Sequence, residues 1–304
     1  MSGIGFFIVP KDEDIFAMDP QDLADSLYAL ADSPVCGLPT GDYDVIPIGA
    51  PKTVSTFDTD ALAYITAVEA ADGEALEDGV REAIDAFVKG CKADAIWDAI
   101  KASCILAGAR TLNGCLVPLV GAAPTNFNFV SADYDRKTGL KGDEATKYLN
   151  SNRPFNADAV NNVHISAYTT TAPTSPGRYV GARGNREILG NILEDGFRTR
   201  FGSNTLYTLA TGLDSTPCLI GCSRSSSAGF SWRSYGAGGT QTDTISAATG
   251  FPYHIFAQSA SDGDGAISMT AARLSFYSIG EAIDLTALDA RVTTLMTALD
   301  GAIA

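Results

Sequence analysis

The feature that most restricts the fold of this chain is a long β-rich run across residues 126–280. It contains about a dozen short segments rich in β-branched and aromatic residues, each bounded by Gly, Pro, Asn or Ser. Some of them alternate: in VHISAY, Val163 and Ile165 lie on one face of a strand, and His164 and Ser166 lie on the other. Short strands at such close spacing predict an antiparallel β-sandwich rather than an open α/β sheet.

On both sides of this run, apolar residues recur at the three- and four-residue spacing that is typical of amphipathic helices. Before it, three amphipathic stripes predict three short helices that end at Gly73, Gly90 and Gly108. After it, Asp284 is the predicted N-cap of a final helix that packs against the sheet. The apolar positions are Leu62, Ile65 and Val68; Leu76, Val80, Ile84, Phe87 and Val88; Ile96, Trp97, Ile100, Cys104 and Ile105; and, in the final helix, Leu285, Leu288, Val292, Leu295 and Leu299.

Together these patterns predict an α+β protein in three parts. Residues 1–57 are predicted to be an N-terminal arm that docks on another component, with candidate strands in GIGFFIVP and DYDVIPIGAP. Residues 58–115 are predicted to be a small helical segment, because short turns separate its helices. Residues 116–304 are predicted to be the antiparallel β-sandwich, closed by the C-terminal helix.

The net charge of −15 is unevenly distributed. Residues 1–110 hold 20 of the 36 acids and 7 of the 21 bases, which gives −13 there and leaves −2 for the rest. Such an acidic surface repels a phosphate backbone, so we expect no nucleic acid partner. No apolar run is long enough to insert in a membrane. Two interpretations of the acidic half stay open: a solvated helical face, or a docking surface for a basic partner.

No catalytic motif stands out in the sequence. His164 and His254 do not have the HxH or HExxH spacing of a metal site, and no GxxxxGK[ST] phosphate loop or GxSxG elbow is present. The clustered ExDxE carboxylates of sandwich-fold glucanases are also missing from the sequence. The chain is therefore predicted not to be an enzyme, with a carbohydrate-active hydrolase on the same fold as the alternative.

One polar and aromatic stretch, SRSSSAGFSWRSYGAGG, is a candidate for recognition of a glycan. Trp232 and Tyr235 could stack on a sugar ring while Arg233 hydrogen-bonds its hydroxyls. The alternative is that Trp232, which shares a strand face with Phe230, belongs to the core. The glycines of GAGGT, at residues 236–240, predict a hairpin tip.

A second candidate site is the acidic loop SASDGDG. Its Asp262 and Asp264 are two residues apart on a turning backbone and could converge on Ca²⁺. Asp–Gly pairs are also ordinary turn formers, which is the competing interpretation. The sequence thus predicts no required cofactor, and Ca²⁺ is the one metal for which it offers ligands.

Several pieces of the chain, spread across residues 58–304, resemble a family of tailed-bacteriophage virion proteins. In that family a short helical segment precedes a concanavalin A-like, or laminin G-like, jelly-roll domain. The resemblance implies a structural component of tails, tail fibres or other appendages, often associated with host-surface glycans, and it brings no catalytic residues. The first 57 residues depart from the family pattern. The similar pieces are residues 64–126, 139–152, the hairpin CSRSSSAGFSWRS and residues 272–299.

From the resemblance we expect a non-enzymatic structural protein on the outer surface of a phage particle. It would display the jelly roll for host attachment or particle stabilisation, as a tail fibre or receptor-binding protein. Capsid decoration or a head fibre is the runner-up, and a lectin outside any virus is a third hypothesis. The expected partners are other virion proteins through the N-terminal segment and further copies of the chain, since fibre-like assemblies are cyclic oligomers, with a homotrimer as the specific expectation.

Overall fold

The structure is a computed structural model that describes residues 6–10, 43–47, 57–173, 175–184, 186–191, 196–211, 217–245, 249–261 and 265–304. The chain divides into two compact units, Met1–Thr56 and Phe57–Ala304. In the first unit, β1 (Phe6–Pro10) pairs antiparallel with β2 (Tyr43–Pro47). Both strands that the sequence predicts in this segment are therefore confirmed.

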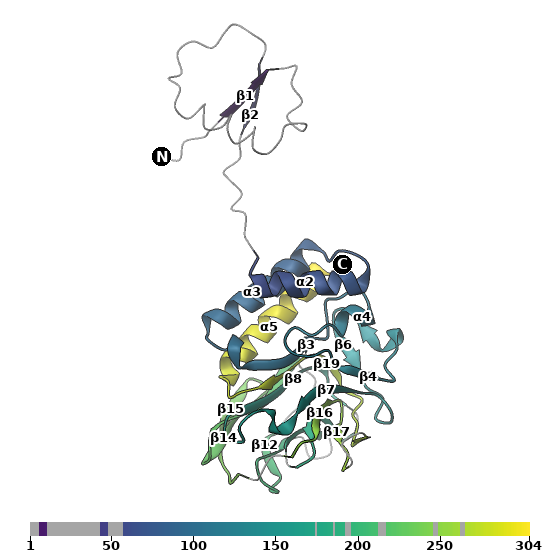
Figure 1. The fold of residues 1–304 in the computed structure, drawn as a ribbon, viewed down its shortest axis with the longest axis vertical. Coiled ribbons are helices and arrows are strands. Elements are labelled where there is room, and N and C mark those ends of the chain that lie inside the picture. Colours follow the sequence, from purple (N-terminus) through teal and green to yellow (C-terminus); the bar gives the residue numbers. More distant parts are fainter. Residues whose placement is uncertain are drawn as a thin grey trace. The chain divides into compact units, whose positions relative to one another are not determined.

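The second unit is built on two antiparallel sheets (Figure 1). The first contains β3 (Ile100–Ile105), β5 (Tyr134–Asp135), β6 (Gly139–Lys141), β8 (Val163–Thr171), β13 (Cys218–Ser226), β14 (Gly229–Ser234), β15 (Ala237–Thr242) and β19 (Arg273–Gly280). The second contains β4 (Thr125–Phe127), β7 (Tyr148–Pro154), β9 (Gly177–Ala182), β10 (Arg186–Asn191), β11 (Gly196–Phe201), β12 (Tyr207–Thr211) and β16 (Pro252–Ile255). The short strands β17 (Gln258–Ser259) and β18 (Ala266–Ile267) pair with each other.

Strand order shows that the chain crosses repeatedly between the two sheets. The eight-stranded sheet runs β15-β14-β13-β8-β19-β6-β5, with β3 paired to β19 off this path. The seven-stranded sheet runs β12-β11-β10-β9-β16-β7-β4. Strands β7, β8 and β9 are consecutive in sequence, yet β8 lies in one sheet and its two neighbours lie in the other.

The two sheets pack face to face around a hydrophobic core. The ring of Phe201 on β11 lies 5.5 Å from that of Phe230 on β14, edge to face. Cys222 on β13 lies 3.6 Å, sulfur to oxygen, from the Thr199 hydroxyl on β11. These contacts join opposite sheets, so the described residues of the second unit form an antiparallel β-sandwich with attached helices, as the sequence predicts at this level.

The described residues of this unit also form four α-helices: α2 (Thr59–Asp72), α3 (Asp78–Ala93), α4 (Leu112–Cys115) and α5 (Leu285–Ala302). Short 3₁₀ turns occupy Trp97–Ala99, Ser131–Asp133 and Phe155–Ala157. As predicted, Asp284 caps α5, accepting a 2.8 Å hydrogen bond from the Thr286 amide. No helix in the described ranges is both long and apolar enough to span a membrane.

Helices α3 and α5 cover the outer face of the eight-stranded sheet (Figure 1). The Phe87 ring of α3 lies 5.8 Å from the Phe276 ring of β19, edge to face. A row of small residues then crosses four strands: Ser103, Ser278, Ser166 and Gly221. A Cβ placed on Gly221 would lie 3.0 Å from a methyl group of Leu285, so this row lets α5 approach the sheet closely.

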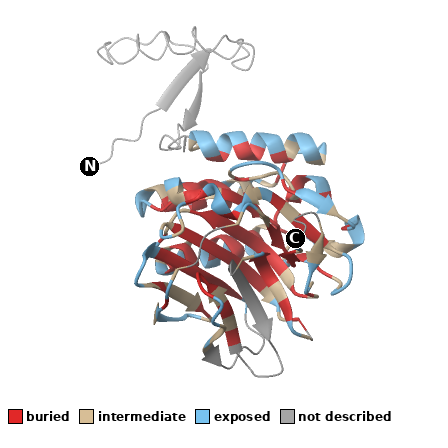
Figure 2. Ribbon diagram, turned by 60° about the horizontal axis from the view of Figure 1, so that its bottom comes forward, coloured by how far each residue is buried: buried red, intermediate tan, exposed pale blue. Residues whose placement is uncertain are grey.

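The sequence VHISAY lies in β8, and both faces of this strand are buried. Figure 2 shows that buried residues are concentrated in the strands of this unit, whereas exposed ones lie mainly on helices and loops. The alternation was predicted correctly, because Ile165 pairs with Cys222 on the inner face while Ser166 pairs with Gly221 on the helix-covered face. Alternation alone gives the two faces of a strand but not what covers each of them. The polar face is buried too, and His164 on it is 0% exposed, with its Nδ1 against the Glu281 carbonyl in the segment that leads from β19 to α5.

The prediction of three helices before the sandwich is wrong for the third. Residues of its apolar stripe form a 3₁₀ turn and then strand β3, which pairs with β19 from Ile100 opposite Gly280 to Ile105 opposite Phe276. Spacing by four, as in Ile100 and Cys104, also fits strand alternation, so the stripe was ambiguous. Pairing with the central strand β19 decides in favour of the strand.

The first two predicted helices are confirmed, with two corrections of detail. Gly90 does not end α3, which continues to Ala93, and its missing side chain makes room for Arg291. Leu62 is 44% exposed, and the buried stripe of α2 is instead Ala61, Tyr64, Ile65 and Val68. The helices share one hydrophobic cluster with both sheets, so residues 57–304 have a common core.

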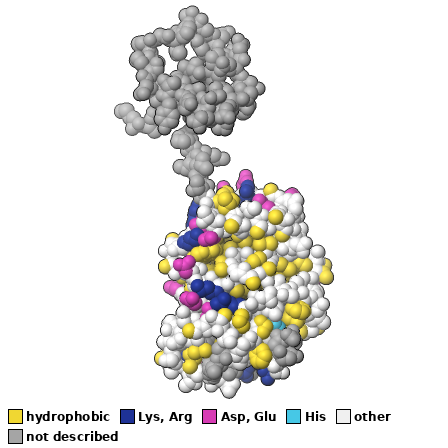
Figure 3. Space-filling view, in the orientation of Figure 1, with side chains coloured by type: hydrophobic (Ala, Val, Ile, Leu, Met, Phe, Trp, Pro, Cys, Tyr) yellow, Lys and Arg dark blue, Asp and Glu magenta, His cyan; other side chains and the backbone are white. Residues whose placement is uncertain are grey.

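Many acids of residues 57–110 are paired with bases. Figure 3 shows acidic and basic side chains next to one another on the face toward the viewer. Arg291 of α5 forms an ion pair with Asp94, with 2.7 Å between Nε and a carboxylate oxygen. Lys92 forms one with Asp58, with 2.6 Å between Nζ and a carboxylate oxygen. Two hydrogen bonds from Arg136 lower the pKa of Glu77 to about 2. This pairing favours the interpretation of a solvated helical face over that of an acidic docking surface in this unit.

Candidate binding groove on the β13, β14 and β15 hairpins

Three hydroxyl-bearing residues align across the last three strands of the eight-stranded sheet. Ser223 on β13 pairs with Ser231 on β14, and Ser231 pairs with Thr240 on β15. Directly paired residues of antiparallel strands share a face, so these side chains lie side by side. Ser223 is two positions from Gly221, which contacts α5, so Ser223 and the two residues aligned with it lie on the helix-covered face where that helix begins.

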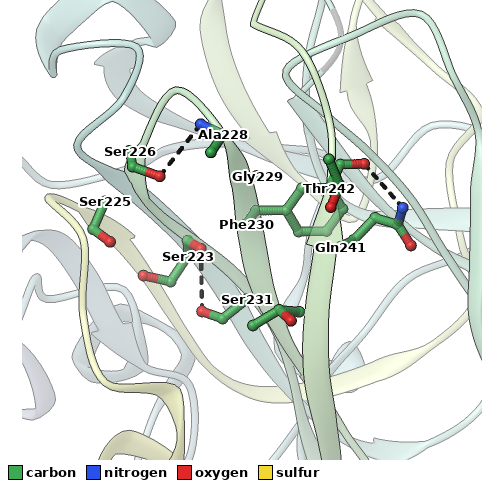
Figure 4. Close-up of a pocket in the computed structure, with 10 residues that line it drawn as sticks. Ser223, Ser225, Ser226, Ala228, Gly229, Phe230, Ser231, Gln241 and Thr242 are labelled. Atoms are coloured by element: carbon green, nitrogen blue, oxygen red, sulfur yellow. Dashed lines mark hydrogen bonds between the residues drawn. The ribbon is translucent and has the colours of Figure 1, made fainter.

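A groove with a volume of about 290 Å³ opens at this row (Figure 4). All of its lining side chains are uncharged, and most carry a hydroxyl group. The lining residues are Ser223, Ser225, Ser226, Ala228, Gly229, Phe230, Ser231, Thr240, Gln241 and Thr242. The volume is at the small end of ligand sites, which suits one or two sugar rings rather than a large cofactor.

Some of these polar groups are used within the groove and others are available. The Ser231 hydroxyl donates to the Ser223 carbonyl at 3.2 Å, and the Ala228 amide donates to the Ser226 hydroxyl at 3.3 Å (Figure 4). The hydroxyls of Ser225, Thr240 and Thr242 bond to no residue in the part of the chain that the structure describes. The groove therefore presents unengaged hydroxyls, each able to donate and accept.

One end of the groove is closed by the segment that leads into α5. The Ile283 amide donates a 2.8 Å hydrogen bond to the Ser223 hydroxyl. Farther along the same row, His164 pairs with Ser223 on one side and with Gly280 on the other. The row is thus buried at His164 and becomes accessible from Ser231 outward.

Behind the groove, a buried ion pair supports the hairpin. Arg224 is 0% exposed, and its guanidinium donates to the Phe201 carbonyl at 2.8 Å and to the Asp243 carboxylate at 3.3 Å. It also donates to the Ser226 carbonyl at 3.4 Å. The Tyr207 hydroxyl donates to Asp243 at 3.0 Å. This network links both sheets at the base of the groove.

The three residues predicted to bind a glycan do not form a common site. Trp232 and Arg233 are adjacent on β14, so their side chains point to opposite faces of the sheet. Trp232 points inward, half-buried, with its ring 6.3 Å from that of Phe197. Arg233 points toward α5 and donates a 2.7 Å hydrogen bond to Asp289. The alternative interpretation of Trp232, as part of the core, fits its position better.

Tyr235 occupies the turn between β14 and β15. It has a positive φ of 52°, and it packs partly buried against the core. None of the three predicted residues lines the groove. The sequence flagged the correct hairpin through its run of serines but selected its aromatic residues, because strand pairing was needed to see which side chains share an open face.

The predicted calcium ligands Asp262 and Asp264, and Gly263 between them, lie outside the described residues. Within the described ranges, no group of three or more His, Cys, Asp or Glu side chains could hold a metal ion. The Ca²⁺ site therefore stays a prediction from the sequence.

His164 and Ser278 form a pair whose connectivity resembles a catalytic base and nucleophile. His164 Nε2 lies 2.7 Å from the Ser278 hydroxyl, and Nδ1 lies 2.5 Å from the Glu281 carbonyl. Both side chains are 0% exposed, and burial lowers the pKa of His164 to about 4. Since neither lines the groove, a substrate there would not reach them, and we assign the pair a structural role.

The comparisons with known proteins add little to this geometry. No protein-family model matches the chain, and no curated protein sequence matches it. Among solved structures, one that matches is the Trypanosoma rangeli sialidase in complex with 2,3-difluorosialic acid, a covalent intermediate. The match has a TM-score of 0.39 and 9% identity, and it covers 79% of this chain but 38% of the sialidase chain.

This finding corrects the prediction that the protein is not an enzyme. The structure that it resembles is an enzyme, so we no longer exclude catalysis. The chain spans well under half of the sialidase. At so low a TM-score, the match carries no argument for sialidase chemistry.

Proposed function

We propose that this chain is a structural protein of a tailed-phage virion that uses its β-sandwich to attach the particle to a neutral glycan on the host surface. The sequence resemblance over residues 58–304 supports the virion context. Within that context we favour a tail fibre or receptor-binding protein on the particle surface over a capsid decoration or head fibre protein. Other virion proteins would bind through residues 1–57.

We further propose that the sandwich is a concanavalin A-like jelly roll. The crossing pattern supports this assignment, because β7, β8 and β9 alternate between the sheets, and β16 and β19 lie in different sheets as well. Chains that cross repeatedly between two antiparallel sheets are typical of jelly rolls. A simple meander would instead keep consecutive strands in one sheet.

The groove on the β13, β14 and β15 hairpins carries the attachment proposal. Its unengaged hydroxyls on Ser225, Thr240 and Thr242 match the alternating donors and acceptors of sugar hydroxyls. No charged side chain lines it, so an uncharged sugar is favoured over an acidic one. We assign glycan contact to these residues in place of Trp232, Tyr235 and Arg233.

Filling the groove is expected to abolish binding. In a Ser231→Trp variant the indole would occupy the centre of the groove, and affinity for host cells or purified host polysaccharide should fall about tenfold or more. Biolayer interferometry on the full chain measures this. The matched control is Ser227→Trp, an exposed serine in the turn of the same hairpin that does not line the groove.

Both variants should keep the far-ultraviolet circular dichroism of the parent, because neither position is fully buried. Equal binding by Ser231→Trp and Ser227→Trp would place glycan contact elsewhere on the protein. If the parent itself binds neither host cells nor polysaccharide, the attachment role is wrong.

Removal of Met1–Thr56 tests the docking role of the N-terminal segment. Because residues 57–304 share one core, the truncated chain is expected to fold but not to be incorporated into phage particles. Thermal unfolding reports the fold, and immunoblots of purified particles report incorporation. Normal incorporation of a folded, truncated chain would disprove the docking role.

A further inference from the structure

Strand β15 forms one end of the eight-stranded sheet and is unusually open. In the described ranges it pairs with β14 on one side and with no strand on the other. All six of its residues are exposed except Gln241, which is half-buried. An edge strand of this kind offers unpaired backbone groups to another strand.

The hairpin turn determines which backbone groups face outward. Tyr235 and Gly236 have positive φ angles of 52° and 75°, so the two-residue loop is of type I′. Its flanking residues, Ser234 and Ala237, then form a hydrogen-bonded pair, and such pairs alternate along the ladder. The N–H and C=O groups of alternate residues of β15 therefore point outward. These residues are Gly238, Thr240 and Thr242.

An independent hydrogen bond supports this alternation. The Asp243 amide donates to the Ala228 carbonyl at 3.3 Å, one pair beyond Gly229 and Thr242. That bond places the hydrogen-bonded pairs of the ladder at odd-numbered residues of β15. The prediction that residues 236–240 form the hairpin tip is wrong for four of them: the turn is Tyr235 and Gly236, and residues 237–240 belong to β15.

This edge lacks the features that usually block strand addition. Strand β15 contains no proline and no charged residue, and its register with β14 is uninterrupted by a bulge. The outer part of the hairpins, residues 225–242, contains no acid and a single base, Arg233, in a chain of net charge −15. Arg233 is already bonded to Asp289. Two acidic copies can therefore approach each other here without repulsion between facing carboxylates.

We propose that β15 pairs antiparallel with β15 of a second copy of the chain, so that two eight-stranded sheets become one. With Thr240 opposite Thr240 of the second copy, Gly238 lies opposite Thr242 on either side. All three outward residues are then paired, through up to about six hydrogen bonds. The Thr242 carbonyl already accepts from Gln241 Nε2 at 2.9 Å and from the Tyr207 hydroxyl at 3.4 Å, so there the Gly238 amide of the second copy takes the place of one of these donors. The contact is isologous, because each copy presents the same edge.

Antiparallel pairing keeps the same sheet face on the same side in both copies. The row from Ser223 through Ser231 to Thr240 then continues into the second copy, and the two grooves adjoin across the axis. This consequence rests on the proposed function, whereas the pairing itself does not. Two joined grooves would bind a repeating polysaccharide with greater avidity than one.

The test uses the full chain and one pair of variants. Gly238→Pro removes an outward N–H and leaves the hydrogen bonds to β14 in place, so it should abolish the pairing. Gly238→Ala is the matched control, since it adds the same Cβ and keeps the N–H. Light scattering after size exclusion should give the parent and Gly238→Ala twice the chain mass of 31.7 kDa, and Gly238→Pro a single chain mass.

Three results would overturn the proposal: a monomeric parent, a trimeric parent, or a Gly238→Pro variant that pairs as the parent does. The trimeric result would support the expectation from the sequence. If Gly238→Pro does not fold, amide hydrogen exchange of the parent decides. The amides of Gly238, Thr240 and Thr242 should be protected at high concentration and lose protection on dilution, and unprotected amides at every concentration would exclude the pairing. Glycan binding is measured separately, so either proposal can fail alone.

Discussion

The Arg224→Ala variant is expected to lose about 3–5 kcal/mol of unfolding free energy, because it leaves the Asp243 carboxylate buried without its charged partner. Arg224 is 0% exposed and Asp243 is 7% exposed, so water cannot replace the lost interaction. The Phe201 carbonyl also loses its guanidinium donor, and the ring of Phe230 loses a cation 5.6 Å from its centroid. For a domain of this size, the loss lowers Tm by roughly 8–15 °C.

The same change should weaken the groove. The Arg224 guanidinium donates to the Ser226 carbonyl, and the Ser226 hydroxyl accepts from the Ala228 amide, so the outer turn depends on this side chain. We expect reduced glycan binding even below the unfolding temperature. Thermal unfolding and biolayer interferometry of the same preparation measure the two effects.

Arg291→Ala is the control for this prediction. Arg291 makes two hydrogen bonds to the Asp94 carboxylate, at 2.7 and 2.8 Å, which are shorter than the 3.3 Å bond from Arg224 to Asp243, but the Arg291 pair is exposed to solvent and screened. Its removal should shift Tm far less than removal of Arg224. Equal shifts would show that the buried pair contributes no more to stability than a surface pair.

The second large effect that we expect is a loss of folding stability in mild acid, at pH values above those at which the carboxylates titrate. Burial lowers the pKa of both His164 and His254 to about 4, from the ordinary value of 6.5. Above pH 6.5 both histidines are neutral in the folded and unfolded chain, so they have no effect there. As the pH falls from 6.5 toward 4, the two histidines become protonated in the unfolded chain but stay neutral in the folded chain. Protonation therefore favours the unfolded state, and the free energy of unfolding decreases.

The size of the loss follows from this linkage. Each histidine should lower the free energy of unfolding by about 2 kcal/mol at pH 5. The two together should lower it by roughly 4 kcal/mol, out of the 5–15 kcal/mol that is typical of a protein. Carboxylates with lowered pKa, such as Glu77 at about 2, act at lower pH and do not overlap this window. Urea unfolding at pH 7.5 and pH 5 measures the difference.

A single substitution separates the two histidines. His254 is 0% exposed, neither ring nitrogen has a hydrogen-bond partner among the described residues, and its ring lies 4.8 Å from that of Tyr148. His254→Phe keeps an aromatic ring and removes the titrating group, so it should halve the loss at pH 5 without destabilising the protein at pH 7.5. An unchanged loss at pH 5 would mean that His254 does not titrate in this range.

Much of the fold could be predicted from local pattern. The alternation in VHISAY, the Asp284 cap and the Gly73 stop each reflect a short-range preference, and the structure has all three. Strand β3 could not be predicted, because Ile100 and Cys104 fit either a helix face or a strand face. What decides is its pairing partner β19, about 170 residues away in sequence.

The groove shows the same limit. The serine-rich hairpin was predicted from composition, but the prediction of one site containing Trp232 and Arg233 was wrong, because adjacent residues of a strand point to opposite faces. That Ser223, Ser231 and Thr240 share an open face depends on the register of two hairpins. It also depends on where α5 begins, which no local pattern specifies.

The sequence by itself determined the strand-rich character of this protein, its capped helices and the hairpin on which to look for a binding site. These follow from backbone preferences and periodicity over a few residues. Only the tertiary structure decided that His164 is buried, that Trp232 faces inward and that β15 is an open edge. Burial and exposure arise from which distant segments pack together, and that information is spread over the whole chain.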